Sequence, residues 1–103
     1  MLQEKLPAAF IDLEAFDRNI AKARQLFRGK KQTLRLATKS LRVPGLIWRA
    51  LDSGMPFQGL MCYSAEEALF LASRGFNDFL IAYPTLQKSD LAAIKELHDQ
   101  EKK

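Results

Sequence analysis

The sequence has very few of the residues that build disulfides, metal centres and catalytic triads. Cys62 is its single cysteine, and His98, in a polar stretch near the end of the chain, is its single histidine. One cysteine excludes an intramolecular disulfide and a multi-cysteine site, and we expect Cys62 to pack in a strand rather than to react. One histidine in a solvated tail supports neither a zinc site nor a Ser-His-Asp triad, so we expect no metal site.

Long apolar runs and blocks of like charge are missing too. No apolar run is long enough to span a bilayer, and residues 1–7 hold none of signal-peptide length, so we expect a cytoplasmic chain without a membrane partner. Sixteen Lys and Arg against twelve Asp and Glu give a net charge of +4, with short basic clusters only at 28–31 and 102–103. These clusters are typical of solvated helix ends. No nucleic-acid recognition motif accompanies them, so we expect no nucleic-acid partner, whereas a phosphate-bearing small ligand fits the charge.

What the sequence does have is a regular alternation of strand-length apolar segments with amphipathic helical segments. The apolar periodicity predicts strands at 8–13, 33–40, 57–63 and 78–83. It predicts helices at 14–27, from Pro44 to about Asp52, from Ala65 to Arg74 and from Ser89 onward, and Ser64 and Glu67 have the spacing of a capping box. The alternation indicates parallel strands joined by right-handed crossovers, an α/β fold. We interpret the four βα units as the N-terminal half of a (β/α)8 TIM-type barrel, with a small open sheet as the alternative.

Two cations fall on one face of the predicted 33–40 strand. Strand side chains alternate, so Arg35 and Lys39 share a face with Ala37 between them. Parallel sheets are normally covered on both faces, so the pair indicates either a buried cavity or an edge strand in water, and spacing alone leaves both open. At the carboxyl end of a barrel strand, a partly desolvated Lys39 beside another cation is a candidate amine nucleophile of the Schiff-base type.

Four segments, taken in order and with their spacing, carry a family resemblance. They are residues 8–20 (AAFIDLEAFDRNI), 34–40 (LRLATKS), 64–68 (SAEEA) and 79–84 (FLIAYP). Together they resemble the start of the alanine racemase-like fold-type III pyridoxal-phosphate enzymes, in particular the amino-acid aldolase, deaminase and D-threonine aldolase branch. The resemblance covers nearly the whole chain, so we treat residues 1–103 as one partial alanine racemase-like barrel domain.

The resemblance implies a cofactor and roles for three residues. Lys39 is implied to form the internal aldimine with pyridoxal 5'-phosphate, and the substrate to be a small amino acid, D-amino acids included. Arg35 matches the arginine of the family's Arg-x-x-x-Lys pattern and either holds a charge network below the cofactor or pairs structurally with an acid such as Asp12. Tyr83, at the end of the predicted fourth strand, either lines the cofactor pocket or simply packs.

Two departures from the family narrow this expectation. Many D-threonine aldolase relatives carry histidines on either side of the cofactor lysine, where this chain has Ala37 and Leu41. The family's later barrel strands and C-terminal β-domain have no counterpart here, and the chain lacks a glycine-rich phosphate cradle. We therefore expect the N-terminal part of a racemase, aldolase or deaminase, inactive by itself, whose unclosed sheet edges favour a homo-oligomer. The alternatives are a non-catalytic pyridoxal-phosphate homeostasis protein of the same fold type and an inactive fragment.

Overall fold

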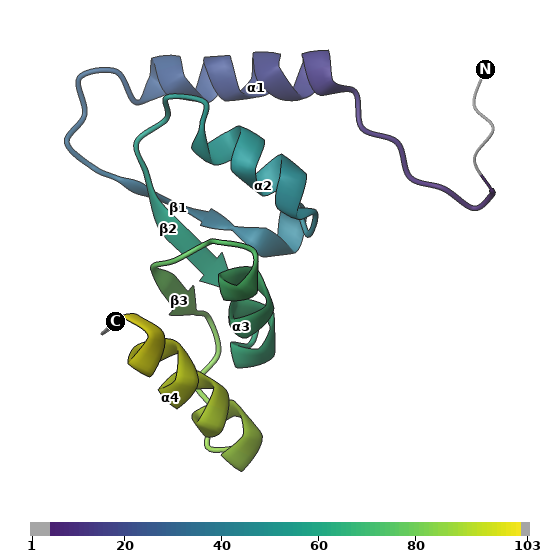
Figure 1. Cartoon of the computed structure of the whole chain (residues 1–103). Helices are drawn as coiled ribbons and strands as arrows, with labels where there is room; N and C mark the ends of the chain where they lie inside the picture. The colour runs from purple at the N-terminus through teal and green to yellow at the C-terminus, as the bar shows by residue number, and fades with distance from the viewer. Residues whose placement is uncertain (1–4, 102–103) are drawn as a thin grey trace.

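The computed structural model describes residues 5–101 and places a parallel three-stranded sheet among four helices (Figure 1). In chain order the elements are α1 (Leu13–Leu26), β1 (Leu34–Ala37), the 3-10 turn η1 (Thr38–Ser40), α2 (Pro44–Leu51), β2 (Phe57–Cys62), α3 (Ala65–Ser73), β3 (Phe79–Ile81) and α4 (Lys88–Glu101). The strand order is β1-β2-β3. The predicted α/β class and parallel pairing are confirmed. Residues 1–4 and the basic pair 102–103, with the outer limits of the predicted 1–103 domain, lie outside the described residues.

The predicted first strand is not found. Residues 8–12 have no regular secondary structure, and Phe10 and Ile11 are more than half exposed. In Figure 1 this segment runs away from the sheet before α1 begins at Leu13. A segment with this apolar pattern forms a strand only if another strand satisfies its backbone hydrogen bonds, and none of the described strands does so here. The described residues thus hold three strands, and the four predicted βα units are not confirmed.

The predicted helices form close to their expected bounds because their end signals are used. Asp12 caps α1, its Oδ1 accepting from the Ala15 amide at 3.1 Å. Pro44 occupies the first turn of α2, and Ser64 caps α3 through the Glu67 amide at 3.1 Å. Asp12 and Ser64 each pair a backbone amide that would otherwise lack a partner at a helix start, and Pro44 has no amide hydrogen that needs one. None of the helices within residues 5–101 has the length and apolar character needed to cross a membrane.

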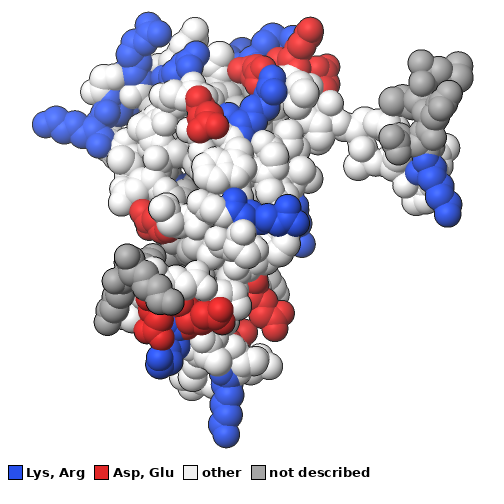
Figure 2. Space-filling view, in the orientation of Figure 1, with Lys and Arg blue, Asp and Glu red and all other residues white. Residues whose placement is uncertain are grey.

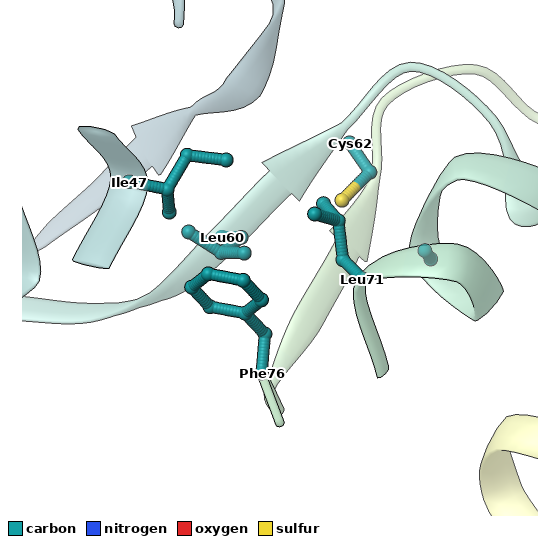
Figure 3. Close-up of a cluster of buried hydrophobic side chains, with 6 residues drawn as sticks. Ile47, Leu60, Cys62, Leu71 and Phe76 are labelled. Carbon is teal, nitrogen blue, oxygen red and sulfur yellow. The ribbon is translucent and has the colours of Figure 1, made fainter. Parts of the chain in front are cut away.

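One face of the sheet carries the core. Figure 3 shows side chains from α2, β2 and α3 converging with Phe76 on this face, and the buried cluster comprises Ile47, Leu60, Cys62, Ala68, Leu71 and Phe76. Strand side chains alternate, so Met61 and Leu80 point to the opposite face, where Leu80 is 51% exposed. Within the described residues that opposite face is open, which is unusual for a parallel sheet.

A bulge in β2 shapes the contact between the strands. Leu34 pairs with Phe57 but Leu36 pairs with Leu60, so β2 has one extra residue between these pairs. Gly59 accommodates the bulge with φ +66°, and a Cβ there would collide with the carbonyl of Asp78 and approach Arg35 Nη1 to 2.6 Å. Glycine is therefore required for both the backbone conformation and the close approach of β3.

Charge is mixed over the surface. Figure 2 shows basic and acidic side chains on both the upper and the lower parts of the visible face. This mixing accords with the interspersed charges of the sequence.

Candidate functional site

Lys39 lies in the 3-10 turn that directly follows β1. The strand ends at Ala37, and the amides of Leu41 and Arg42 donate to the Thr38 carbonyl at 3.0 and 2.9 Å, closing the turn. The prediction of one strand through Ser40, with Arg35 and Lys39 on one face, is therefore wrong. Lys39 is exposed, so the expected partial desolvation is not found in the described structure. The lysine still stands where the carboxyl ends of the parallel strands meet.

Arg35 points toward the amino end of β3 instead. Its Nη1 donates to the Asp78 carbonyl at 2.8 Å and to Asp78 Oδ1 at 2.9 Å, and lies 3.4 Å from the Leu60 carbonyl. Asp12, suggested from the sequence as a partner, instead caps α1, so that pairing is wrong. Arg35 thus joins β1 to the start of β3 and lies toward the end of the sheet opposite Lys39.

Tyr83 is brought together with a second tyrosine. The rings of Tyr63, which follows β2, and Tyr83, which follows β3, meet edge to face with centroids 5.1 Å apart. Both side chains are more than half exposed at the carboxyl ends of their strands. They border a groove of about 360 Å³ that also includes residues at the starts of α3 and α4.

A second groove, of about 300 Å³, meets the first at Tyr63 and Ser64 and includes Arg42, Glu67 and Phe70. Arg42 Nε donates to the Lys39 carbonyl at 3.3 Å, which places this groove beside η1. Two larger hollows, of about 530 and 540 Å³, lie around Asp78 and between α1 and α2, away from the carboxyl ends. The smaller grooves are therefore the candidate site, because Arg42, which lines one of them, contacts the Lys39 carbonyl; Lys39 itself lines neither groove.

A hydrogen-bonded cluster underlies η1. Thr38 is fully buried, and its hydroxyl donates to Glu67 Oε1 and lies 3.3 Å from the Met61 carbonyl. Glu67 Oε2 accepts from the Tyr63 amide at 3.2 Å. The sequence pattern indicates Glu67 only as half of a capping box and does not single out Tyr63 or Arg42. The one available signal was position, because each lies within a few residues of a strand's carboxyl end.

The residues at this site fit pyridoxal phosphate in part. An exposed lysine amine is available to the cofactor's aldehyde, and the Tyr63–Tyr83 pair offers aromatic faces for its ring. Arg42 is the one Lys or Arg among the residues that line the two grooves. Among residues 5–101 no group of His, Cys, Asp and Glu side chains is arranged to hold a metal ion.

Comparison with known proteins gives a likeness among solved structures. No family model matches the sequence, and a search of curated proteins found no match. Among solved structures, D-threonine aldolase from Filomicrobium marinum is similar with a TM-score of 0.80 and 28% identity, over 90% of this chain and 24% of that one. This chain thus spans about a quarter of that protein's length. The resemblance to the alanine racemase-like fold-type III pyridoxal-phosphate enzymes, predicted from the sequence, is thereby confirmed.

Proposed function

We propose that this chain is the lysine-bearing part of a pyridoxal-phosphate-dependent enzyme that acts on a small amino acid, D-amino acids included. Aldol cleavage, racemisation and deamination are the candidate reactions. The observation that carries the proposal is the similarity to a D-threonine aldolase over 90% of the chain. It is supported by the position of Lys39 directly after β1, at the edge of the sheet where α/β folds carry their chemistry.

Each candidate residue has a distinct role in this proposal. Lys39 would hold the cofactor covalently, through its side-chain amine and the cofactor's aldehyde group. Tyr83, with Tyr63, flanks the ring, and Arg35 acts from below by fixing β1 to the start of β3. When bound, pyridoxal phosphate supplies an electron sink for the carbanion formed at the substrate α-carbon. The Lys39 amine would also be placed to move a proton at that carbon.

We propose turnover only for a longer protein that contains this chain, because the chain spans about a quarter of the length of the similar aldolase. The described sheet leaves one face uncovered, so we expect residues 1–103 alone to lack turnover. A cytoplasmic location and a homo-oligomeric assembly remain part of the proposal. Cofactor binding without turnover in a longer form of the protein would favour the alternative, a homeostasis protein of the same fold type.

Covalent trapping tests the role of Lys39. The protein is mixed with pyridoxal phosphate, reduced with borohydride and mapped by peptide mass spectrometry. We expect the adduct at Lys39 to exceed that at Lys95, a well-exposed lysine on α4, by about tenfold, the ratio that a modest difference in binding free energy gives. Lys39→Ala should abolish the main adduct, and Lys95→Ala should leave it unchanged. Equal labelling of many lysines would refute the proposal.

A further inference from the structure

Glu67 links the ends of two strands to the start of a helix. Its Oε1 accepts from the hydroxyl of Thr38, directly after β1, and its Oε2 accepts from the amide of Tyr63, directly after β2, at 3.2 Å. Its own amide donates to the Ser64 hydroxyl at 3.1 Å in the first turn of α3. One carboxylate therefore fixes three elements at the edge of the sheet that carries Lys39.

This geometry differs from the capping box that the sequence predicted. In a capping box the glutamate side chain returns to the amide of the cap residue itself, here Ser64. The Ser64 half of the motif forms, but the carboxylate binds the amide one residue earlier and the Thr38 hydroxyl. The Glu67 carboxylate therefore binds the ends of two strands instead of capping its own helix.

Thr38 passes this constraint to Lys39. Thr38 is fully buried, with 0% of its surface accessible, and it is the one buried polar residue among those described. Its carbonyl accepts both amides that close η1, while its side chain is held by Glu67. Without Glu67 the Thr38 hydroxyl keeps only the longer contact with the Met61 carbonyl at 3.3 Å, so its side chain is held less firmly, and movement of Thr38 displaces the next residue, Lys39.

We propose that Glu67 is a positioning residue for Lys39, acting through Thr38 to fix the turn from which the lysine side chain projects. This inference rests on the proposed function, in which the Lys39 amine must meet an aldehyde in one orientation. Reaction rates are sensitive to such placement because a nucleophile held in the reactive geometry avoids most of the entropic cost of the encounter.

The variants separate the contact from general effects on stability. Glu67→Ala removes both acceptors. Glu67→Gln keeps the shape, since its amide oxygen accepts from Tyr63 and its amide nitrogen donates to Thr38, whose hydroxyl then donates to the Met61 carbonyl. Thr38→Val removes the hydroxyl at constant shape, and Thr38→Ser keeps it. Glu66→Ala is the matched control, because Glu66 is an exposed acid in the same first turn of α3.

The first measurement needs no cofactor. Amide hydrogen exchange at Leu41 and Arg42 reports on the hydrogen bonds that close η1. We expect Glu67→Ala and Thr38→Val to speed this exchange by about tenfold, as the loss of a buried hydrogen-bond partner implies, and Glu66→Ala to leave it unchanged. Unchanged exchange in both variants would overturn the inference.

The second measurement is the rate of the borohydride-trapped pyridoxal-phosphate adduct at Lys39, normalised to that at Lys95. We expect it to fall about tenfold in Glu67→Ala and Thr38→Val, and to stay within about threefold of the parent in Glu67→Gln and Thr38→Ser. Faster exchange with an unchanged adduct rate would overturn the positioning role. If Glu67→Ala does not fold, as judged by circular dichroism, the Thr38→Val and Thr38→Ser pair decides the same question.

The proposed function and the positioning role of Glu67 are refuted by measurements on different proteins. Absence of a Lys39 preference in the parent protein refutes the proposed function, and with it the positioning role, before any variant is compared. A Lys39 preference that survives Glu67→Ala and Thr38→Val refutes the positioning role alone.

Discussion

Cys62 shows how burial controls chemistry at a single residue. Its side chain is 1% exposed in the core beneath α3. The pKa of the thiol is raised from 9.0 to about 11, mainly by burial and also by the negative charge of Glu67, while a hydrogen bond with Thr38 acts in the opposite direction. The thiol is therefore protonated and shielded at neutral pH, which agrees with the prediction that Cys62 packs rather than reacts.

This shift makes stability depend on pH at the alkaline end. The folded-state pKa lies above the unfolded value, so the unfolded chain loses its thiol proton first as pH rises from 9.0 toward about 11. We expect the free energy of unfolding to fall by about 2 kcal/mol between about pH 8 and 10.5 through this group. Urea unfolding at a series of pH values gives the free energy of unfolding of the parent and of Cys62→Ala. The contribution of this thiol is the difference between the two proteins in how that free energy changes with pH. Identical pH slopes for the two proteins would contradict the assignment.

At the scale of elements, helices of similar pattern are held to different degrees. α3 buries Ala65, Ala68 and Leu71, whereas α1, although amphipathic as predicted, buries none of its residues. α1 is joined to α2 by the exposed Asp17–Arg49 ion pair, with 2.6 Å between Oδ2 and Nη2. The hydrogen bond from Arg49 lowers the pKa of Asp17, but exposed pairs of this kind stabilise a fold little. We infer that α1 opens without unfolding the rest.

Removing the N-cap of α1 and of α3 in separate variants shows whether each helix unfolds together with the core. An N-cap substitution by alanine costs about 1 kcal/mol of helix stability in either case. Ser64→Ala at the start of α3 should lower the global free energy of unfolding by that amount, measured by urea denaturation. Asp12→Ala at the start of α1 should instead speed hydrogen exchange within α1 and leave the urea midpoint unchanged. An equal drop in midpoint for both variants would show that α1 unfolds with the core.

At the scale of the whole molecule, the described sheet is unclosed. β1 and β3 are its edges, each with one hydrogen-bonded neighbour, β2, among residues 5–101. The face opposite the core exposes Leu80, and Phe10 and Ile11 are exposed on the segment before α1. Parallel sheets normally have both faces covered, and free edges pair readily with other strands. These features support the homo-oligomer expected from the sequence.

Self-association should therefore depend on the open face of the sheet. We expect light scattering to show association that increases with concentration, and Leu80→Lys to reduce it, because a charge cannot be buried cheaply in such a contact. Leu86→Lys is the control, since Leu86 is 92% exposed in the loop before α4 and lies outside the sheet. A stable monomer at high concentration would argue strongly against the half-barrel interpretation.

The sequence by itself determined the features that depend on local chemistry. Apolar periodicity located all four helices and the strands β1, β2 and β3, although it placed the end of β1 too late, and single residues such as Pro44 and Ser64 set where helices begin. The resemblance carried by the four segments, and a lysine close to the carboxyl end of a strand, could also be predicted from the sequence alone. Each of these depends on neighbours a few positions apart, which a sequence pattern records.

Only the tertiary structure decided the features that depend on distant partners. Residues 8–12 have a strand's pattern but no neighbouring strand to pair with. Arg35 pairs with Asp78, 43 positions away, rather than with Asp12, and Glu67 binds Thr38, 29 positions away. Lys39 leaves the strand because Thr38 closes a turn there. Hydrogen bonds and burial between such distant residues are fixed by how the elements pack, and no local pattern specifies that packing.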